Sequence, residues 1–279
     1  MSDRNKYLGA TDVAAVLGLS PWRSPYEVWA EKTGRLEHRP AGEAAAAGLQ
    51  LERPVLDWFA STVEPIRRHP ERRIKGTPIL CHPDAIALKS KAPVEAKTSG
   101  ITGPIHGTWG DPGTDQIPDV YLVQALVQIE ATRADRCYVP ALLGGRGFLL
   151  YQVPSHPQLQ EQIVEAACRW WDEHIVGDRP PEGASAPLEI VKRIRREPDS
   201  VIDLGEEAIE LLNRWQEAKE RLKEAQAQVD AAQAAILLAL GDAEAARLSD
   251  GRMITYLKQS RSEYVVPATE FRVLRIRRK

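Results

Sequence analysis

Two acidic side chains and one lysine lie close together in the chain, Asp84 in C-H-P-D-A and Glu95 and Lys97 in V-E-A-K-T-S. Residues two apart on a strand point to the same face, so Glu95 and Lys97 project together. Asp84 joins them if the two segments pair as a hairpin. Carboxylate oxygens suit Mg²⁺ or Mn²⁺. A cation held there lowers the pKa of a bound water and neutralises charge on a phosphate, while the lysine orients that water or stabilises the oxyanion.

The sequence around these residues predicts the hairpin that the chemistry needs. Residues 79–88 form a run that is apolar except at its centre, residues 89–91 supply a polar turn, and a second short strand covers 93–99. An E-x-K triplet on an exposed strand is common and does not by itself indicate catalysis. An aspartate at hairpin distance and the neighbouring segments strengthen the catalytic interpretation.

Helices and further strands are predicted on both sides of the hairpin. The helices are expected at 11–18, 25–33, 43–61, 118–131 and 157–176, and the strands at 137–142 and 148–153. Thr11 and Ser24 are the expected N-caps of the first two helices. Pro54 is expected to kink the third helix. The Gly- and Pro-rich stretch after Lys97 is expected to be a loop that faces a substrate.

Several polar and aromatic residues allow two interpretations. Glu52 is either a surface charge or a carboxylate turned towards the metal patch. Trp22 packs in the interior, or it stacks on a terminal base near a nucleic-acid site. Tyr121, Gln124 and Gln128 share one helix face, which is either the wet side of that helix or part of the site. The basic residues between positions 67 and 75 are either solvated or used to neutralise phosphates.

The C-terminal part has a different character. Residues 177–188 have the composition of a linker, and residues 189–279 are predicted to form a helical and β appendage. Apolar residues recur at alternating spacings of three and four from Ala208 to Ala239, which predicts a long helix with a coiled-coil seam. The partner of this seam is either this chain or another subunit. Strands are expected at 253–258 and 264–267, followed by a basic tail.

Composition limits the environment more than the activity. The 279 residues are 43% hydrophobic and 27% charged, as in ordinary globular proteins, and the net charge of −2 gives no global case for nucleic-acid binding. The scattered Cys81, Cys137 and Cys168 argue for a reducing compartment and against zinc or an iron–sulfur cluster. Without a secretory signal or an apolar run of about 20 residues, a cytoplasmic protein that does not associate with membranes is expected.

Several motifs together resemble the YqaJ-like viral recombinase nucleases, relatives of phage lambda exonuclease in the PD-(D/E)XK superfamily. The matching segments are L-G-A-T-D-V-A-A-V-L-G-L-S-P-W-R-S-P-Y-E-V-W (8–29), G-L-Q-L-E (48–52), C-H-P-D-A (81–85), V-E-A-K-T-S (94–99) and Y-L-V-Q (121–124). The resemblance covers about residues 4–176. It implies an α/β fold with a restriction-endonuclease-like core in residues 1–176, in which helices flank a central mixed sheet.

The resemblance also implies roles for individual residues. Asp84, Glu95, the Ala96 carbonyl and Glu52 would bind Mg²⁺, for which Mn²⁺ can substitute. Lys97 would position and activate the attacking water, and Gln124 would orient the site. The residues implied to contact the substrate are Arg4, Thr11, Trp22, Tyr121 and His82, with Arg4 and Thr11 placed at a 5′-terminal phosphate. The family's further basic residue after the lysine is replaced here by T-S-G-I-T-G, which leaves the polarity of digestion open.

The implied activity is Mg²⁺-dependent 5′→3′ exonuclease action on double-stranded DNA in a bacterial or phage-infected cell. The implied partners are a single-strand annealing protein and further copies of the chain in a ring-like trimer. Two other interpretations stay open. One is an endonuclease that cuts internal sites, and the other is a non-catalytic DNA-end-binding scaffold, which the near-neutral charge and the long helix would allow.

Overall fold

The structure is a computed structural model that describes residues 3–36, 42–68, 70–102, 105, 107–182, 188–192 and 201–260. The chain divides into two compact units, Met1–Arg196 and Glu197–Lys279, and each is described by itself. The boundaries expected from composition, with a linker at 177–188, stay a prediction. Within the described residues, no helix combines the length and the apolar character needed to cross a membrane.

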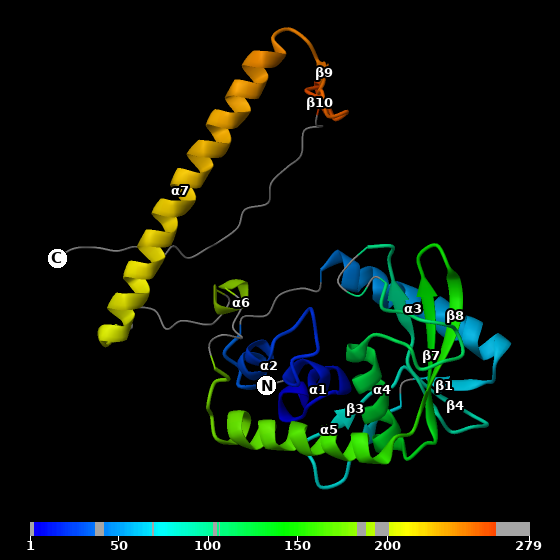
Figure 1. Ribbon diagram of the computed structural model, residues 1–279. Coiled ribbons are helices and arrows are strands. Elements are labelled where there is room, and N and C mark those ends of the chain that lie inside the picture. Colours follow the sequence, from blue (N-terminus) through cyan, green and yellow to red (C-terminus); the bar gives the residue numbers. More distant parts are fainter. Residues whose placement is uncertain are drawn as a thin grey trace. The chain divides into compact units, whose positions relative to one another are not determined.

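A six-stranded mixed sheet forms the centre of the first unit (Figure 1). Its strands are β1 (Ile66–Arg68), β4 (Ala85–Ala87), β5 (Pro93–Val94), β6 (Lys97–Ser99), β7 (Arg136–Leu143) and β8 (Gly147–Pro154). The strand order is β1-β4-β5-β7-β6, and β8 pairs with β7. β5 and β6 run parallel to β7, and the other pairs are antiparallel. A separate pair joins β2 (Arg72–Arg73) to β3 (Leu80–Cys81).

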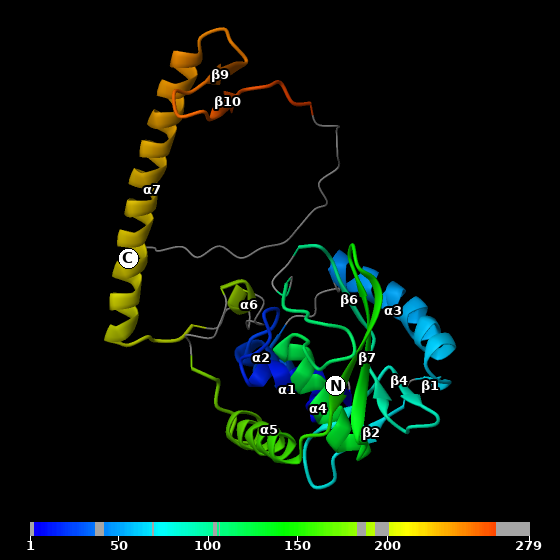
Figure 2. The ribbon, with the colours of Figure 1, turned by 45° about the vertical axis from the view of Figure 1, so that its right-hand side comes forward.

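Helices cover both faces of this sheet, with α3 and α4 on opposite sides of β7 (Figure 2). The helical segments of the first unit are η1 (Asp3–Lys6), α1 (Ala10–Val16), α2 (Pro25–Lys32), α3 (Glu43–Thr62), α4 (Asp119–Thr132), α5 (Pro157–Trp170), η2 (Trp171–Val176) and α6 (Leu188–Lys192). Side chains of a strand alternate between faces. Cys137 and Val139 of β7 therefore face the core made with α1, α4 and α5, whereas Tyr138 packs against Phe59 of α3. The predicted fold class, a mixed sheet flanked by helices, is confirmed.

The two predicted N-caps have different outcomes. Ser24 caps α2, because its Oγ accepts a hydrogen bond of 3.2 Å from the Glu27 N–H. The prediction for Thr11 is wrong, because α1 already begins at Ala10 after Gly9 as the N-cap. The carboxylate of Asp12, three residues after this N-cap, accepts the Gly9 N–H at 3.0 Å. Thr11 is exposed within the first turn.

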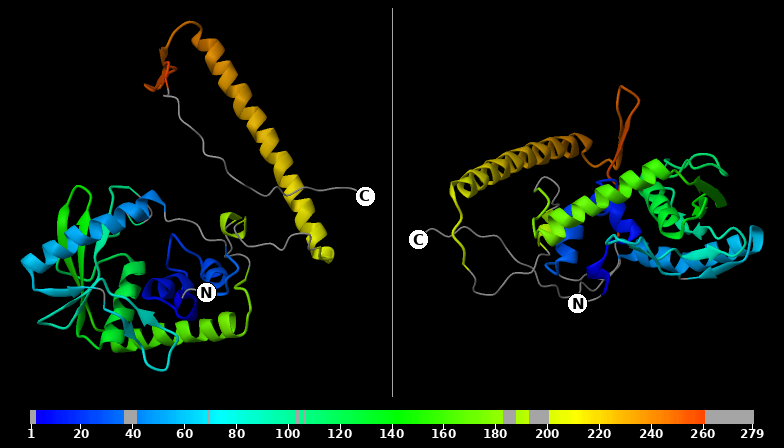
Figure 3. Two further views of the ribbon diagram at one scale, coloured as in Figure 1. Left: turned by 180° about the vertical axis from the view of Figure 1, so that it is seen from behind. Right: turned by 90° about the horizontal axis from the view of Figure 1, so that it is seen from below.

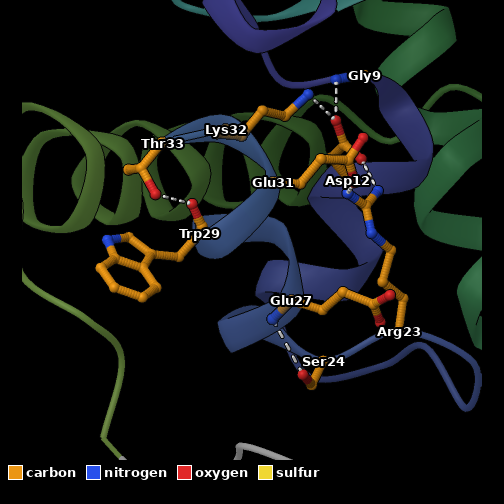
Figure 4. Close-up of polar contacts among 9 residues, drawn as sticks. All are labelled: Gly9, Asp12, Arg23, Ser24, Glu27, Trp29, Glu31, Lys32 and Thr33. Atoms are coloured by element: carbon orange, nitrogen blue, oxygen red, sulfur yellow. Dashed lines mark hydrogen bonds and ion pairs between the residues drawn. The ribbon is translucent and has the colours of Figure 1, made fainter. Parts of the chain in front are cut away.

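A buried charge cluster joins α1 to α2 (Figure 4). Asp12 is 7% exposed, and its carboxylate contacts Lys32 Nζ at 2.7 Å and the guanidinium of Arg23. Arg23 also contacts Glu31. Burial opposes the ionised form of Asp12, but Arg23 and Lys32 outweigh it and lower the pKa of that carboxyl. The cluster fixes the N-terminal helices, and α1 in turn packs against α4.

The second unit contains the predicted long helix, α7 (Glu206–Leu240), which continues unbroken to a short hairpin (Figure 3). Gly205 is its N-cap, and Gly241 follows its last residue with a positive φ. The hairpin pairs β9 (Ala245–Arg247) with β10 (Met253–Thr255). The strand predicted at 253–258 is present in part as β10, which pairs with β9, and its predicted pairing with residues 264–267 stays a prediction. Residues 264–267 lie outside the described residues.

Candidate active site

The register of β4 and β5 brings Asp84 and Glu95 together. Ala85 pairs with Val94 in this antiparallel hairpin, and Asp84 directly precedes the pair while Glu95 directly follows it. The Ala96 N–H donates a hydrogen bond of 2.8 Å to Asp84 Oδ2. The predicted hairpin is therefore present as β4 and β5. Asp84 lies just before the first of these strands, and Glu95 lies just after the second.

Glu95 is the centre of the polar contacts. It is 6% exposed, and Lys97 Nζ lies 2.7 Å from its Oε1 atom. Gln124 Nε2 donates to the same oxygen, and Gln128 Nε2 donates to Oε2 at 2.6 Å. Both glutamines come from α4, on the helix face that was predicted to carry Tyr121, Gln124 and Gln128 together. Three side chains from two elements, β6 and α4, thus fix one carboxylate in a single orientation.

Lys97 lies between charged, polar and aromatic groups. Besides Glu95, its Nζ donates to Gln124 Oε1 at 2.9 Å and lies over the ring of Tyr121, 4.6 Å from the ring centre. Burial disfavours its charged form, but Glu95 and Asp84 outweigh burial and raise the pKa of Lys97. Lys97 is therefore an ammonium at neutral pH, and it acts as a hydrogen-bond donor rather than a base.

Asp84 has the most strongly shifted carboxyl of the site. Burial, together with the negative charges of Glu95 and Glu52, raises the pKa of Asp84 from 3.8 to about 8, against the opposing effects of Lys97 and the Ala96 N–H. Lys97 and the Ala96 N–H thus compensate the negative charge of an ionised Asp84 only in part. Glu52, half-buried on α3, contributes through its charge, and its predicted role as a metal ligand stays a prediction.

The donor set suits a small divalent cation. Mg²⁺ in proteins is commonly held by one or two carboxylates and completes its shell with water. Asp84 and Glu95 supply such carboxylates, and the incompletely compensated charge on Asp84 is what a cation would neutralise. Within the described residues, no three side chains of the His, Cys, Asp and Glu types gather closely enough to bind a metal by themselves. The Ala96 carbonyl, a further ligand that the resemblance implies, stays a prediction.

The residues expected to contact a substrate are distributed unevenly. Trp22 is 52% exposed and stacks on Tyr121 with ring centres 6.0 Å apart, so an exposed indole lies one ring away from Lys97. Thr11 and His82 are exposed, and the side chain of Arg4 lies outside what the structure describes. Their substrate-binding roles stay predictions.

The basic segment 67–75 is partly used in internal contacts. Arg68 pairs with Asp57 of α3, and Arg73 lies over the ring of Tyr7 at 4.2 Å. Arg67 and Lys75 are exposed, and His69 lies outside the described residues. A role of this segment in neutralising phosphates stays a prediction.

Gln128 is a site residue to which sequence reasoning assigned no role. Its position on the face of Tyr121 and Gln124 was recognised, but a polar residue at helical spacing usually marks the solvated side. The structure buries it to 1% exposure beneath Glu95, with Cys137 Sγ 3.9 Å from its Oε1. The available signal was the seven-residue spacing from Tyr121, which places both residues on the same stripe.

Comparison with protein families tests the resemblance proposed from the motifs. Residues 1–135 match the model of the YqaJ-like viral recombinase domain. The resemblance to YqaJ-like proteins is confirmed. The YqaJ-like match includes Asp84, Glu95, Lys97, Gln124 and Gln128.

The chain is also similar to individual proteins. A protein of Bacillus subtilis (strain 168), named "Uncharacterized protein YqaJ", is 28% identical over 256 residues, which are 87% of this chain and 77% of that protein. An alkaline exonuclease (LHK-Exo) from Laribacter hongkongensis is 16% identical with a TM-score of 0.48, and the match covers 63% of this chain and 91% of that one. A phage-related exonuclease from Haemophilus somnus 129PT is 12% identical with a TM-score of 0.47, covering 62% and 96%.

Proposed function

We propose that this protein is a divalent-metal-dependent DNA nuclease that hydrolyses phosphodiester bonds, with Mg²⁺ as its ion and Mn²⁺ as a substitute. The observation that carries the proposal is the meeting of Glu95, Lys97 and Asp84 at the end of one hairpin, with Lys97 Nζ 2.7 Å from Glu95. Asp84, Glu95, the Ala96 carbonyl and Glu52 would hold the ion. When bound, the ion would supply an acidified water and neutralise charge on the phosphate.

The protein's own side chains would orient the reacting groups. Glu95, held by Gln124 and Gln128, keeps a fixed negative charge next to Lys97. An ammonium has three N–H donors. Lys97 donates two of them to Glu95 and Gln124, so the third can orient the attacking water or a phosphate oxygen. Attack of water at phosphorus breaks the bond to the 3′-oxygen, which leaves a 3′-hydroxyl and a 5′-phosphate.

We further propose that the nuclease digests double-stranded DNA from its ends in the 5′→3′ direction, in the cytoplasm of a bacterial or phage-infected cell. The resemblance to YqaJ-like recombinase proteins supports this direction, together with delivery of the exposed strand to a single-strand annealing protein and assembly as a ring-like trimer. Exposed Trp22 beside Tyr121 offers a stacking surface for a terminal base.

Digestion of defined DNA substrates tests the proposal. Purified protein is incubated with linear duplexes bearing either 5′-phosphate or 5′-hydroxyl ends and with a covalently closed circular duplex, each with millimolar Mg²⁺, Mn²⁺ or a chelator. We expect metal-dependent loss of nucleotides from 5′ ends of the linear duplexes and an intact circle. Cleavage of the circular duplex would show that the protein is an endonuclease and not an exonuclease. If the linear duplexes stay intact with both Mg²⁺ and Mn²⁺, the nuclease proposal is wrong and the interpretation as a DNA-end-binding scaffold remains.

A further inference from the structure

The apolar seam of α7 is an exposed surface that the nuclease site does not use. α7 has no buried residue in the described part of its unit. Leu222 is 69%, Val229 57% and Ile236 47% exposed, all on the seam that runs from Ala208 to Ala239. A single amphipathic helix in water gains most of its stability from packing of its apolar face. α7 has 35 residues and is about 52 Å long at 1.5 Å per residue. We therefore expect another helix or segment to pack along its apolar face.

The sizes of the seam residues indicate how two such helices would pack. One set of alternate seam positions is mostly large, and the other is mostly alanine. The large set is Trp215, Leu222, Val229 and Ile236, with Ala208 at its start, and the small set is Ala218, Ala225, Ala232 and Ala239, with Leu211 at its start. In a parallel pair, each layer would join two large or two small residues, which leaves the layers uneven. In an antiparallel pair, each layer joins one position of each set, so large side chains meet alanines in every layer except those at the two ends, which contain Ala208 and Leu211.

Charges beside the seam favour the same direction. In a parallel pair, the flanking position of Arg214 faces that of Lys219 on the other helix, which brings like charges together. Lys219 is held at the edge of the seam, because its Nζ lies 4.6 Å from the ring centre of Trp215. An antiparallel pair places Lys219 beside the uncharged Gln226 instead. The dipoles of the two helices also oppose each other in this arrangement.

We propose that α7 pairs with α7 of a second copy of this chain as an antiparallel coiled coil. In the register that overlaps the helices along their whole length, Leu222 lies opposite Ala225 of the partner subunit. Trp215 then lies opposite Ala232 of the partner subunit, and Val229 opposite Ala218 of the partner subunit. The pairing joins two chains through their second units, independently of any assembly of the first units.

Mixed disulfide formation tests both the partner and the direction. Full-length Ala208→Cys and Ala239→Cys proteins are prepared in a background in which the half-buried Cys168 is replaced by serine. Each is oxidised alone and after mixing. We expect a disulfide-linked dimer in the mixture, because positions 208 and 239 of two antiparallel chains face each other. Neither protein should cross-link alone, because like positions lie about 46 Å apart along the helix axis.

Two other outcomes would overturn the pairing. Dimers of Ala239→Cys alone would show a parallel arrangement. Absence of cross-links in every sample would show that the seam is covered by something other than a second copy, such as another part of this chain. A charge variant provides a second readout. Leu222→Glu, on the seam, should lower the assembly mass measured by light scattering, whereas Ala227→Glu, on the opposite side of α7, should leave that mass unchanged.

Discussion

Gln128 Nε2 donates a hydrogen bond of 2.6 Å to Glu95 Oε2 from a side chain that is 1% exposed. This bond comes from the helix that crosses behind the hairpin, whereas Lys97 reaches the other oxygen of the same carboxylate from the hairpin itself. The two contacts hold the two oxygens of the Glu95 carboxylate. The orientation of the central carboxylate thus depends on how α4 packs against the sheet.

Loss of the Gln128 donor should cost both stability and activity. Gln128→Leu leaves an oxygen of Glu95 without its buried donor, which should lower the free energy of unfolding by about 1–3 kcal/mol. A double-mutant cycle with Glu95→Gln, measured by urea unfolding, isolates the pair. The effect of Gln128→Leu should shrink in the Glu95→Gln background. Equal losses in both backgrounds would show that Gln128 acts only through packing.

Removal of Lys97 should stop hydrolysis while the protein stays folded. Lys97→Ala takes away the ammonium, but Gln124 and Gln128 continue to donate to Glu95. We expect the cleavage rate to fall by about 10²–10³-fold, the range for loss of one positioned hydrogen-bond donor. Initial rates on linear duplex and the circular dichroism spectrum are compared with those of Lys89→Ala, an exposed lysine in the hairpin turn. If Lys97→Ala cleaved DNA at the wild-type rate, the proposed role of Lys97 in hydrolysis would be wrong.

The raised pKa of Asp84 should make stability depend on pH. Between about pH 4 and pH 8, folded Asp84 holds a proton that the unfolded chain has released, so the free energy of unfolding falls as pH rises. The limiting slope for one group is about 1.4 kcal/mol per pH unit. Urea unfolding from pH 5 to pH 9 with a chelator measures it.

Asp84→Asn and Mg²⁺ provide the controls for this slope. The neutral side chain of Asp84→Asn should flatten the pH dependence and raise stability at pH 8. Mg²⁺ should stabilise the wild-type protein most at high pH, because an ionised Asp84 binds it better. If wild type and Asp84→Asn have parallel pH profiles, Asp84 is not the titrating group.

The charge cluster between α1 and α2 should be more important for stability than a surface ion pair. Asp12→Ala removes the buried carboxylate that Lys32 and Arg23 both contact, and we expect a loss of about 3–5 kcal/mol. Asp57→Ala removes a carboxylate with an exposed side chain that pairs with Arg68 and Arg53, and the expected loss is about 0–1 kcal/mol. Similar melting temperatures for the two variants would contradict this difference.

Trp22 should contribute to DNA binding rather than to folding. Stacking of one base on an aromatic ring is worth about 1–3 kcal/mol, so Trp22→Ala should weaken binding of duplex ends by about 5–150-fold. Trp22→Phe, which keeps a stacking ring, should retain most of the affinity. Fluorescence anisotropy with labelled duplexes in Ca²⁺ measures binding without requiring cleavage. Unchanged affinity of Trp22→Ala would assign the ring to packing on Tyr121 alone.

Local patterns of the sequence determined much of the structure around the site. The polar turn at 89–91 predicted the hairpin, the two-residue spacing predicted that Glu95 and Lys97 share a face, and helical spacing predicted the common face of Tyr121, Gln124 and Gln128. These features depend on strand and helix periods and on turn chemistry, which act over a few residues. The single helix α7 followed from its regular seam for the same reason.

Tertiary structure decided which of these faces is covered and which polar groups meet. Spacing places Gln128 in line with Gln124 but does not show that the stripe lies beneath Glu95, because this depends on β5 and β7 packing against α4. The raised pKa of Asp84 comes from burial, from Glu95 and also from Glu52 on α3, a helix that precedes the hairpin by many residues. Gly9 rather than Thr11 is the N-cap of α1, with its N–H bound by Asp12, and β10 pairs with β9, a strand that was not predicted. Burial and pairing depend on contacts between distant segments, and no local pattern specifies those.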